Sequence, residues 1–230
     1  MISQLKNRKV IFFDVGYTLD KPASGDWMFT KRFLKEAGDR LNTRSADEIS
    51  RAKEAGLRFL TQNHLITTVE AECEQFFQYY SIISDELELD LSEEQRMAAA
   101  QDRACNMENY IPYPGIHEVL ESLSKTHKLG VISDTWPSIE RQLDYLGISR
   151  YFSFRTFSCF LGVFKPDVRM YRDALNKSGA SAEEAVFIDD SVRNLEGAAA
   201  LGILPILIAA NPEADVETFF LKIKDLRELI

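Results

Sequence analysis

Polar residues that could carry out chemistry follow three short apolar runs of the chain. They are Asp14 after residues 10–13, Ser133 and Asp134 after residues 129–132, and Asp189 and Asp190 after residues 185–188. Each run has the length and composition of a buried β-strand. Because ligands bind beyond the carboxyl ends of the strands in an open parallel sheet, we expect these side chains to meet at one edge.

These residue types at one edge predict a phosphoryl-transfer site. Several carboxylates repel one another unless a cation lies among them. Oxygen ligands select a hard ion, for which Mg²⁺ is the expected choice. Lys165, which follows the run 154–157 through a loop, and Ser133 suit a tetrahedral anion such as phosphate. A metal, a cationic lysine and a carboxylate nucleophile are the parts that phosphoryl transfer needs.

The elements that must position these residues alternate between strand and helix from about residue 112 onward. Helical patterns separate the predicted strands at 129–132, 154–157, 185–188 and 204–208, and a closing helix is predicted over 216–229. Such alternation predicts a Rossmann-like, doubly wound parallel sheet with helices on both faces. The strand at 10–13 must join this sheet, because a single strand cannot pack alone.

The segment over residues 21–110 has a helical pattern throughout. Its apolar residues recur at helical spacing, and Ser45 and Ser92 each begin a pattern that resembles a capping box at a helix start. We therefore predict a helical domain over 21–110, inserted into an α/β core formed by residues 1–20 and 111–230.

The composition of the 230-residue chain excludes several classes of protein. The net charge of −9 argues against binding to nucleic acid or to an anionic membrane, since both require a basic surface. No stretch is long and apolar enough for a transmembrane span, and the first residues lack the apolar core of a signal peptide. Three cysteines without a CxxC pair point to a reducing compartment. We expect a cytoplasmic protein, present as a monomer or a homodimer.

Four motifs in this order resemble those of the haloacid dehalogenase-like (HAD) hydrolase superfamily. The first is the aspartate of Asp14-Val15-Gly16-Tyr17-Thr18, the second is Ser133, the third is the lysine of the pattern from Ser158 through Gly162 to Lys165-Pro166, and the fourth is the pair Asp189-Asp190. The helical segment between the first two motifs is similar in its place to the helical cap of the family's first type.

The resemblance implies a nucleophile and a metal site. Asp14 would attack the substrate and form an aspartyl-phosphate. Mg²⁺ would bind Asp14, the backbone carbonyl of Gly16 and Asp190, and Asp189 would bind the ion or orient its waters.

The resemblance also implies the substrate. Ser133 and Lys165 would hold the phosphoryl oxygens, and Asp134 and Thr18 are further candidates for contact with this group. The implied activity is that of a Mg²⁺-dependent phosphatase acting on a small phosphorylated metabolite.

One position departs from the phosphatase pattern of the family. The family places a second aspartate, which serves as general acid and base, two residues after the nucleophile, where this chain has Gly16. Such catalysis contributes roughly a hundred- to ten-thousand-fold in rate. Either the substrate has a good leaving group, or Asp20, Asp26 or Asp134 takes the role, or the protein binds its ligand and barely turns it over.

Two other functions on the same scaffold remain open. The chain could be a dehalogenase or a phosphonate-cleaving enzyme, since members of these classes lack the second aspartate; the phosphonate enzyme needs a lysine of the cap, for which Lys31, Lys35 and Lys53 are available. It could also be a metabolite-binding protein with a weak or decayed site.

Overall fold

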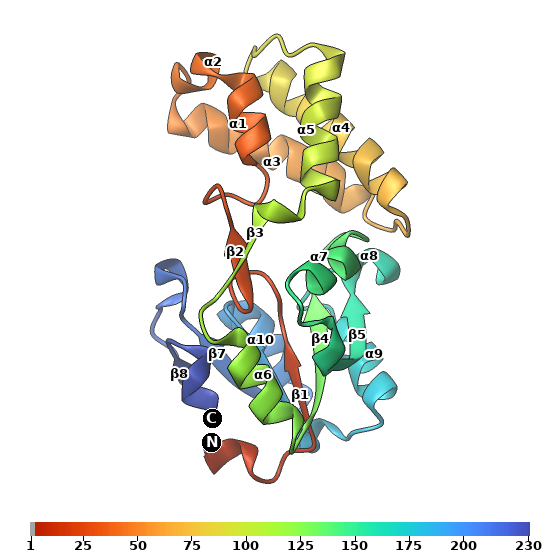
Figure 1. Ribbon diagram of the computed structural model, residues 1–230, viewed down its shortest axis with the longest axis vertical. Coiled ribbons are helices and arrows are strands. Elements are labelled where there is room, and N and C mark those ends of the chain that lie inside the picture. Colours follow the sequence, from red (N-terminus) through yellow and green to blue (C-terminus); the bar gives the residue numbers. More distant parts are fainter. Residues whose placement is uncertain (1–2) are drawn as a thin grey trace.

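The computed structural model describes residues 3–230, in which a β-sheet with flanking helices forms one half of the molecule and a set of helices the other (Figure 1). The sheet has six parallel strands in the order β5-β4-β1-β6-β7-β8. Their bounds are β1 Val10–Phe13, β4 Lys128–Ser133, β5 Phe152–Phe157, β6 Ala185–Asp189, β7 Leu204–Ile208 and β8 Leu221–Ile223. The predicted Rossmann-like α/β fold is confirmed.

Strand β1 lies at the centre of the sheet because every one of its residues is apolar and buried. Ile11 and Phe13 belong to the apolar core on one face, and Val10 and Phe12 to the core on the other. Phe13 pairs with residues of β4 and β6. This register brings the carboxyl ends of the three strands together.

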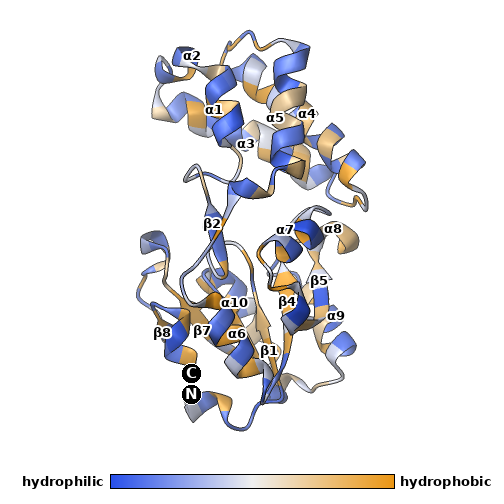
Figure 2. Ribbon diagram, viewed as in Figure 1, coloured by the Kyte–Doolittle hydropathy of each residue, from blue (hydrophilic) through white to orange (hydrophobic). Residues whose placement is uncertain are grey.

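Helices cover both faces of the sheet, whose strands form the apolar interior seen in Figure 2. The apolar sides of α6 (Ile116–Ser124) and α7 (Ile139–Tyr145) pack on one face. Those of α9 (Val168–Ser178) and α10 (Val192–Ala199) pack on the other. One helical turn, α8 (Ser158–Leu161), follows β5.

Five α-helices lie within residues 23–109, a segment that we call the helical insert. They are α1 Lys31–Ala37, α2 Asp39–Asn42, α3 Ala46–Gln62, α4 Val69–Glu86 and α5 Glu93–Cys105. The insert has its own aromatic core, which includes Phe33, Phe76 and Tyr80. The capping boxes predicted at Ser45 and Ser92 are confirmed.

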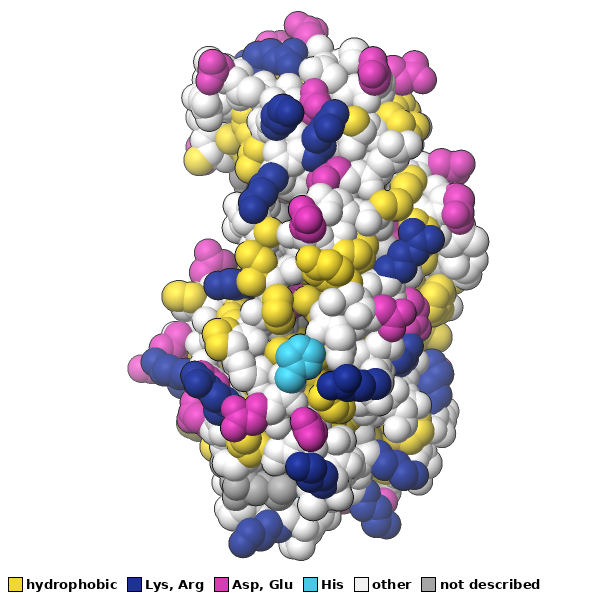
Figure 3. Space-filling view, viewed as in Figure 1, with side chains coloured by type: hydrophobic (Ala, Val, Ile, Leu, Met, Phe, Trp, Pro, Cys, Tyr) yellow, Lys and Arg dark blue, Asp and Glu magenta, His cyan; other side chains and the backbone are white. Residues whose placement is uncertain are grey.

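A two-stranded antiparallel ribbon connects the insert with the sheet. It consists of β2 (Asp20–Pro22) and β3 (Tyr110–Pro112). The periodicity did not reveal these strands, because three residues are too few to show an alternating pattern. Figure 3 shows apolar side chains gathered where the insert meets the sheet half.

The predicted closing helix over 216–229 is wrong. The segment instead contains β8, which adds to the edge of the sheet beside β7, and a 3₁₀ turn, Leu226–Leu229, that begins at the capping residue Asp225. Val216 and Phe219 are exposed, so the apolar pattern here does not mark one buried face. The other 3₁₀ turns are Ser3–Leu5, Met107–Asn109, Ser149–Tyr151, Ala182–Glu184 and Pro212–Ala214. Within residues 3–230, no helix has both the length and the apolar character needed to span a bilayer.

Candidate active site

The carboxyl ends of β1, β4 and β6 form the floor of a cavity of about 290 Å³ beneath the helical insert. Of the residues predicted from the sequence, six line this cavity: Asp14, Gly16, Ser133, Asp134, Lys165 and Asp190. The short helix α8 ends at Gly162, whose φ of 66° lets the chain turn back toward Lys165. The volume fits a small metabolite.

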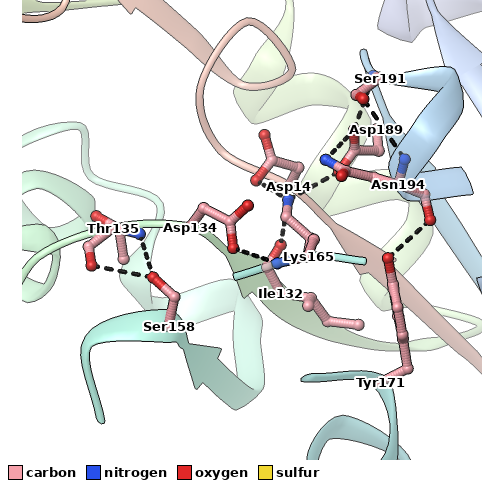
Figure 4. A network of polar contacts seen from close by, with 10 residues as sticks. All are labelled: Asp14, Ile132, Asp134, Thr135, Ser158, Lys165, Tyr171, Asp189, Ser191 and Asn194. Carbon is pink, nitrogen blue, oxygen red and sulfur yellow. Dashed lines mark hydrogen bonds and ion pairs between the residues drawn. The ribbon is translucent and has the colours of Figure 1, made fainter. Parts of the chain in front are cut away.

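Lys165 is the centre of the polar network in Figure 4. Its Nζ donates to Asp14 Oδ1 at 2.6 Å, to Asp189 Oδ2 at 2.8 Å and to the carbonyl of Ile132 at 3.2 Å. Burial alone lowers the pKa of this lysine, but the neighbouring carboxylates outweigh burial and hold the pKa well above its ordinary value. Lys165 is therefore charged, and it fixes one oxygen of Asp14.

Asp189 pairs with Lys165 and is not among the residues that line the cavity. Its side chain is fully buried. One oxygen accepts from the backbone N–H of Ser191 at 2.8 Å and from Asn194 at 3.1 Å, and the other faces Lys165. Both oxygens of Asp189 therefore already accept hydrogen bonds from the protein. The geometry gives no support to the expectation that Asp189 binds the metal or its waters.

Asp14 and Asp190 form the part of the site that fits a divalent cation. Burial, together with the charges of Asp189 and Asp134, raises the pKa of Asp14 to about 7. Burial, together with the charges of Asp14 and Asp189, raises the pKa of Asp190 to about 8, and Lys165 opposes both shifts. The carbonyl of Gly16 accepts no hydrogen bond within the described chain. Mg²⁺ usually takes one or two protein carboxylates and completes its shell with water and substrate phosphate. Two carboxylates and a free carbonyl match that requirement.

The side chains alone do not make a closed metal cage. No cluster of three or more His, Cys, Asp or Glu side chains suited to a metal exists from residue 3 to the end of the chain. This is consistent with a site in which a backbone carbonyl, waters and substrate supply the remaining ligands.

Asp134 and Thr18 differ from their expected roles. Asp134 lines the cavity, and its Oδ1 accepts from the backbone N–H of Lys165 at 2.9 Å, so it holds the loop that carries the lysine. Burial raises its pKa. Thr18 is fully buried outside the cavity wall, and its hydroxyl has no partner in the described structure. The predicted phosphate contact of Thr18 therefore has no support in the geometry.

Of the three candidates for the missing acid, Asp134 alone lines the cavity. Asp20 is fully buried, accepts from Gln142 at 2.5 Å, and has a pKa raised by burial to about 8. Asp26 pairs with Lys53 and accepts from two backbone N–H groups, so it holds the loop before α1.

The insert contributes wall residues that the sequence analysis missed. Trp27, Met28 and Arg103 reach the cavity, where they meet Tyr110 and Trp136. One signal was available for Arg103, because α5 carries it on the same buried stripe as Ala99, Ala100 and Ala104. A lone cation on an apolar helix face calls for a specific reason.

A model of the family described as haloacid dehalogenase-like hydrolase matches residues 45–208. Phosphoserine phosphatase of Thermus thermophilus is 29% identical over 125 residues, which are 52% of this chain and 50% of that protein. The first curated relatives are matched over half of their length or less.

Solved structures show the same fold over nearly the whole chain. A 2-haloacid dehalogenase from Pseudomonas syringae has a TM-score of 0.63 and 20% identity, with 96% of each chain covered. A magnesium-bound HAD-hydrolase of Bacillus subtilis has a TM-score of 0.68 and 16% identity, with 97% of each chain covered. At such low identity, these similarities concern the fold.

Proposed function

Because the chain belongs to the haloacid dehalogenase-like hydrolases, we propose that it is a Mg²⁺-dependent phosphatase of small phosphorylated metabolites that works through Asp14. The observation that carries this proposal is the pair of carboxylates, Asp14 and Asp190, in the wall of one cavity, with Lys165 bound to Asp14. The phosphatase relative supports the same reaction class.

Asp14 is the proposed nucleophile. Its Oδ1 is held by Lys165, which leaves Oδ2 for attack on phosphorus. The new bond joins Oδ2 to phosphorus as the bond from phosphorus to the leaving oxygen breaks, and the leaving group departs with that electron pair. A water oxygen then bonds to phosphorus as the bond between Oδ2 and phosphorus breaks, so Asp14 regains its carboxylate and the phosphate leaves with the protons of the water.

Ser133 and Lys165 are proposed to hold the phosphoryl oxygens, and Asp134 to keep the Lys165 loop in place. Asp14, Asp190 and the carbonyl of Gly16 would hold Mg²⁺, which when bound neutralises charge on the phosphoryl group. Lys165 carries a positive charge beside the reacting atoms, because the carboxylates of Asp14, Asp189 and Asp134 raise its pKa.

We further propose that residues 21–110 act as a cap over a core formed by 1–20 and 111–230. Two contacts tie the insert to the sheet half above the site. Glu72 of α4 accepts from the backbone N–H and the hydroxyl of Ser138, each at 2.7 Å. Trp136 donates through Nε1 to Gln75 at 3.0 Å. When these contacts hold the insert over the cavity, the insert excludes water from the reacting group.

The test uses p-nitrophenyl phosphate and acetyl phosphate, whose leaving groups need little protonation. We expect turnover with Mg²⁺, loss of turnover with EDTA, and recovery with excess Mg²⁺. Asp14→Asn should lower kcat by about a thousand-fold or more. Asp144→Asn, which changes an exposed carboxylate of α7, is the matched control and should leave kcat unchanged. Absence of Mg²⁺-dependent turnover in the folded wild type on both substrates would contradict the proposal.

A second candidate is dehalogenation of a small haloacid, which Gly16 favours because a departing halide needs no proton. Attack by Asp14 on carbon would form a C–O bond as the carbon–halogen bond breaks and halide leaves. Release of chloride from 2-chloropropionate in the presence of EDTA would identify this reaction. Phosphonate cleavage through a cap lysine finds no support, because none of Lys31, Lys35 and Lys53 lines the cavity.

A further inference from the structure

Arg103 of α5 lines the same cavity as Asp14, Ser133 and Lys165 of the sheet edge. The residue is 7% exposed. Its Nη1 donates to the hydroxyl of Tyr110 at 2.7 Å, while Nε is buried without a partner and Nη2 makes no hydrogen bond to any residue of the described chain. Nε and Nη2 form one edge of the planar group, and no residue of the described chain accepts a hydrogen bond from this edge.

The structural contacts of Arg103 do not use that edge. The guanidinium lies 4.7 Å from the ring centroid of Phe76 and 5.8 Å from that of Trp136. Such contacts engage its face and leave the in-plane N–H groups available. The nearby acid, Glu72, acts on Arg103 through space, but both of its oxygens are taken by Ser138.

A buried cation with an unfilled donor edge is costly, because burial removes its water without supplying acceptors. A packing role alone would be met by an apolar residue, as at Ala99, Ala100 and Ala104 on the same stripe of α5. The free Nε and Nη2 edge matches the two oxygens of a carboxylate, with two parallel hydrogen bonds.

We propose that Arg103 binds the carboxylate of the substrate, and that the substrate class is a small phosphorylated carboxylic acid. This inference rests on the proposed phosphatase function, which places the phosphate at Ser133 and Lys165. The aromatic side chains of Trp27, Tyr110 and Trp136 then form the wall around the carbon skeleton. The cavity of about 290 Å³ limits that skeleton to a few carbons.

The test compares two non-hydrolysable ligands of similar shape, 3-phosphonopropionate and its amide, of which only the acid carries a carboxylate. Binding to the wild-type protein is measured by calorimetry with Mg²⁺ present, so the result does not depend on turnover. We expect the acid to bind at least about ten-fold more tightly than the amide, the effect of one charge-assisted pair. Equal affinities would overturn the proposal.

Variants of Arg103 test whether this residue causes the preference for the acid over the amide. Arg103→Met removes the charge and should reduce the acid-to-amide ratio to below about three-fold. Arg103→Lys keeps a charge but loses the planar edge, and it should also reduce the ratio, which covers the case that the methionine variant does not fold. Arg96→Met, on the same helix but outside the cavity, is the control and should keep the wild-type ratio. If a folded Arg103 variant keeps the wild-type ratio of acid to amide affinity, the proposal is wrong.

Hydrolysis of acetyl phosphate by the wild type separates the two ideas. If hydrolysis occurs but the acid and amide bind equally, the assignment of Arg103 fails and the phosphatase proposal stands. If hydrolysis is absent while the Arg103-dependent preference is present, the phosphatase proposal fails and the carboxylate site stands.

Discussion

The indole ring of Trp27 occupies the space into which any side chain at Gly16 would extend. A Cβ atom at Gly16 would lie 3.1 Å from Cζ2 of Trp27, closer than ordinary van der Waals contact. Trp27 is held there in an edge contact with Tyr17, with ring centroids 5.1 Å apart. Trp27 therefore fills the space in which the acidic side chain of the family's phosphatase pattern would lie.

This packing predicts that a single substitution cannot restore the acid. Gly16→Asp should not raise kcat/KM toward an alkyl phosphate, because the new side chain meets Trp27. Gly16→Asp combined with Trp27→Ala should exceed Trp27→Ala alone by at least about ten-fold, a modest part of what general acid catalysis supplies. Steady-state kinetics on ethyl phosphate measures this, with Gly16→Ala as the control for bulk. A gain in the single variant would show that Trp27 is no barrier.

The lack of an acidic side chain at position 16 predicts a steep dependence of kcat/KM on the leaving group. Across a series of aryl phosphates, kcat/KM should rise with the acidity of the phenol, since no side chain at Gly16 protonates the departing oxygen. The double variant Gly16→Asp/Trp27→Ala should show a shallower slope. A flat series for the wild type would indicate that another group, with Asp134 the first to test, donates the proton.

The hydrogen bonds between Glu72 and Ser138 predict how strongly the insert is attached to the sheet half. Glu72→Ala leaves the backbone N–H and the hydroxyl of Ser138 without their acceptor in a buried interface. We expect the free energy of unfolding to fall by about 2–3 kcal/mol, the usual cost of losing hydrogen bonds to a charged group. Urea denaturation measures this change. Glu70→Ala, an exposed position of the same helix, should change it by less than about 0.5 kcal/mol.

The buried side chain of His64 predicts how the free energy of unfolding depends on pH. It lies between the insert and the sheet half, stacked on Phe164 with ring centroids 3.9 Å apart, and its Nε2 pairs with Ser158 Oγ at 2.7 Å. Burial lowers its pKa from 6.5 to about 4. Between these values the unfolded chain binds a proton that the folded chain does not, so acidification favours unfolding.

The wild type should therefore lose stability as the pH falls from about 6.5 toward 4, by at most about 3 kcal/mol from this residue. His64→Gln keeps a donor toward Ser158 but cannot titrate. Urea denaturation at several pH values should give a smaller loss for this variant over that range, and no difference in slope above pH 7. Parallel profiles would exclude His64 as the source.

The positions at the ends of the central strands followed from the sequence alone. Residues 10–13 and 185–188 are apolar on both faces, and such runs are stable only inside a parallel sheet covered by helices. The polar residues that follow each run must then lie at the sheet edge, and they include Asp14 and Asp190. Local signals also located the helix starts at Ser45 and Ser92, because capping depends on near neighbours in the chain.

Only the tertiary structure decided the roles that depend on docking between distant segments. Asp189 does not line the cavity, and its carboxylate pairs with Lys165, which lies in another loop. Trp27 and Arg103 reach the cavity because the insert folds down on the sheet edge, and no local pattern encodes that approach. The segment 216–229 adds a strand because the edge of β7 offered hydrogen bonds, a long-range pairing that its apolar residues did not signal.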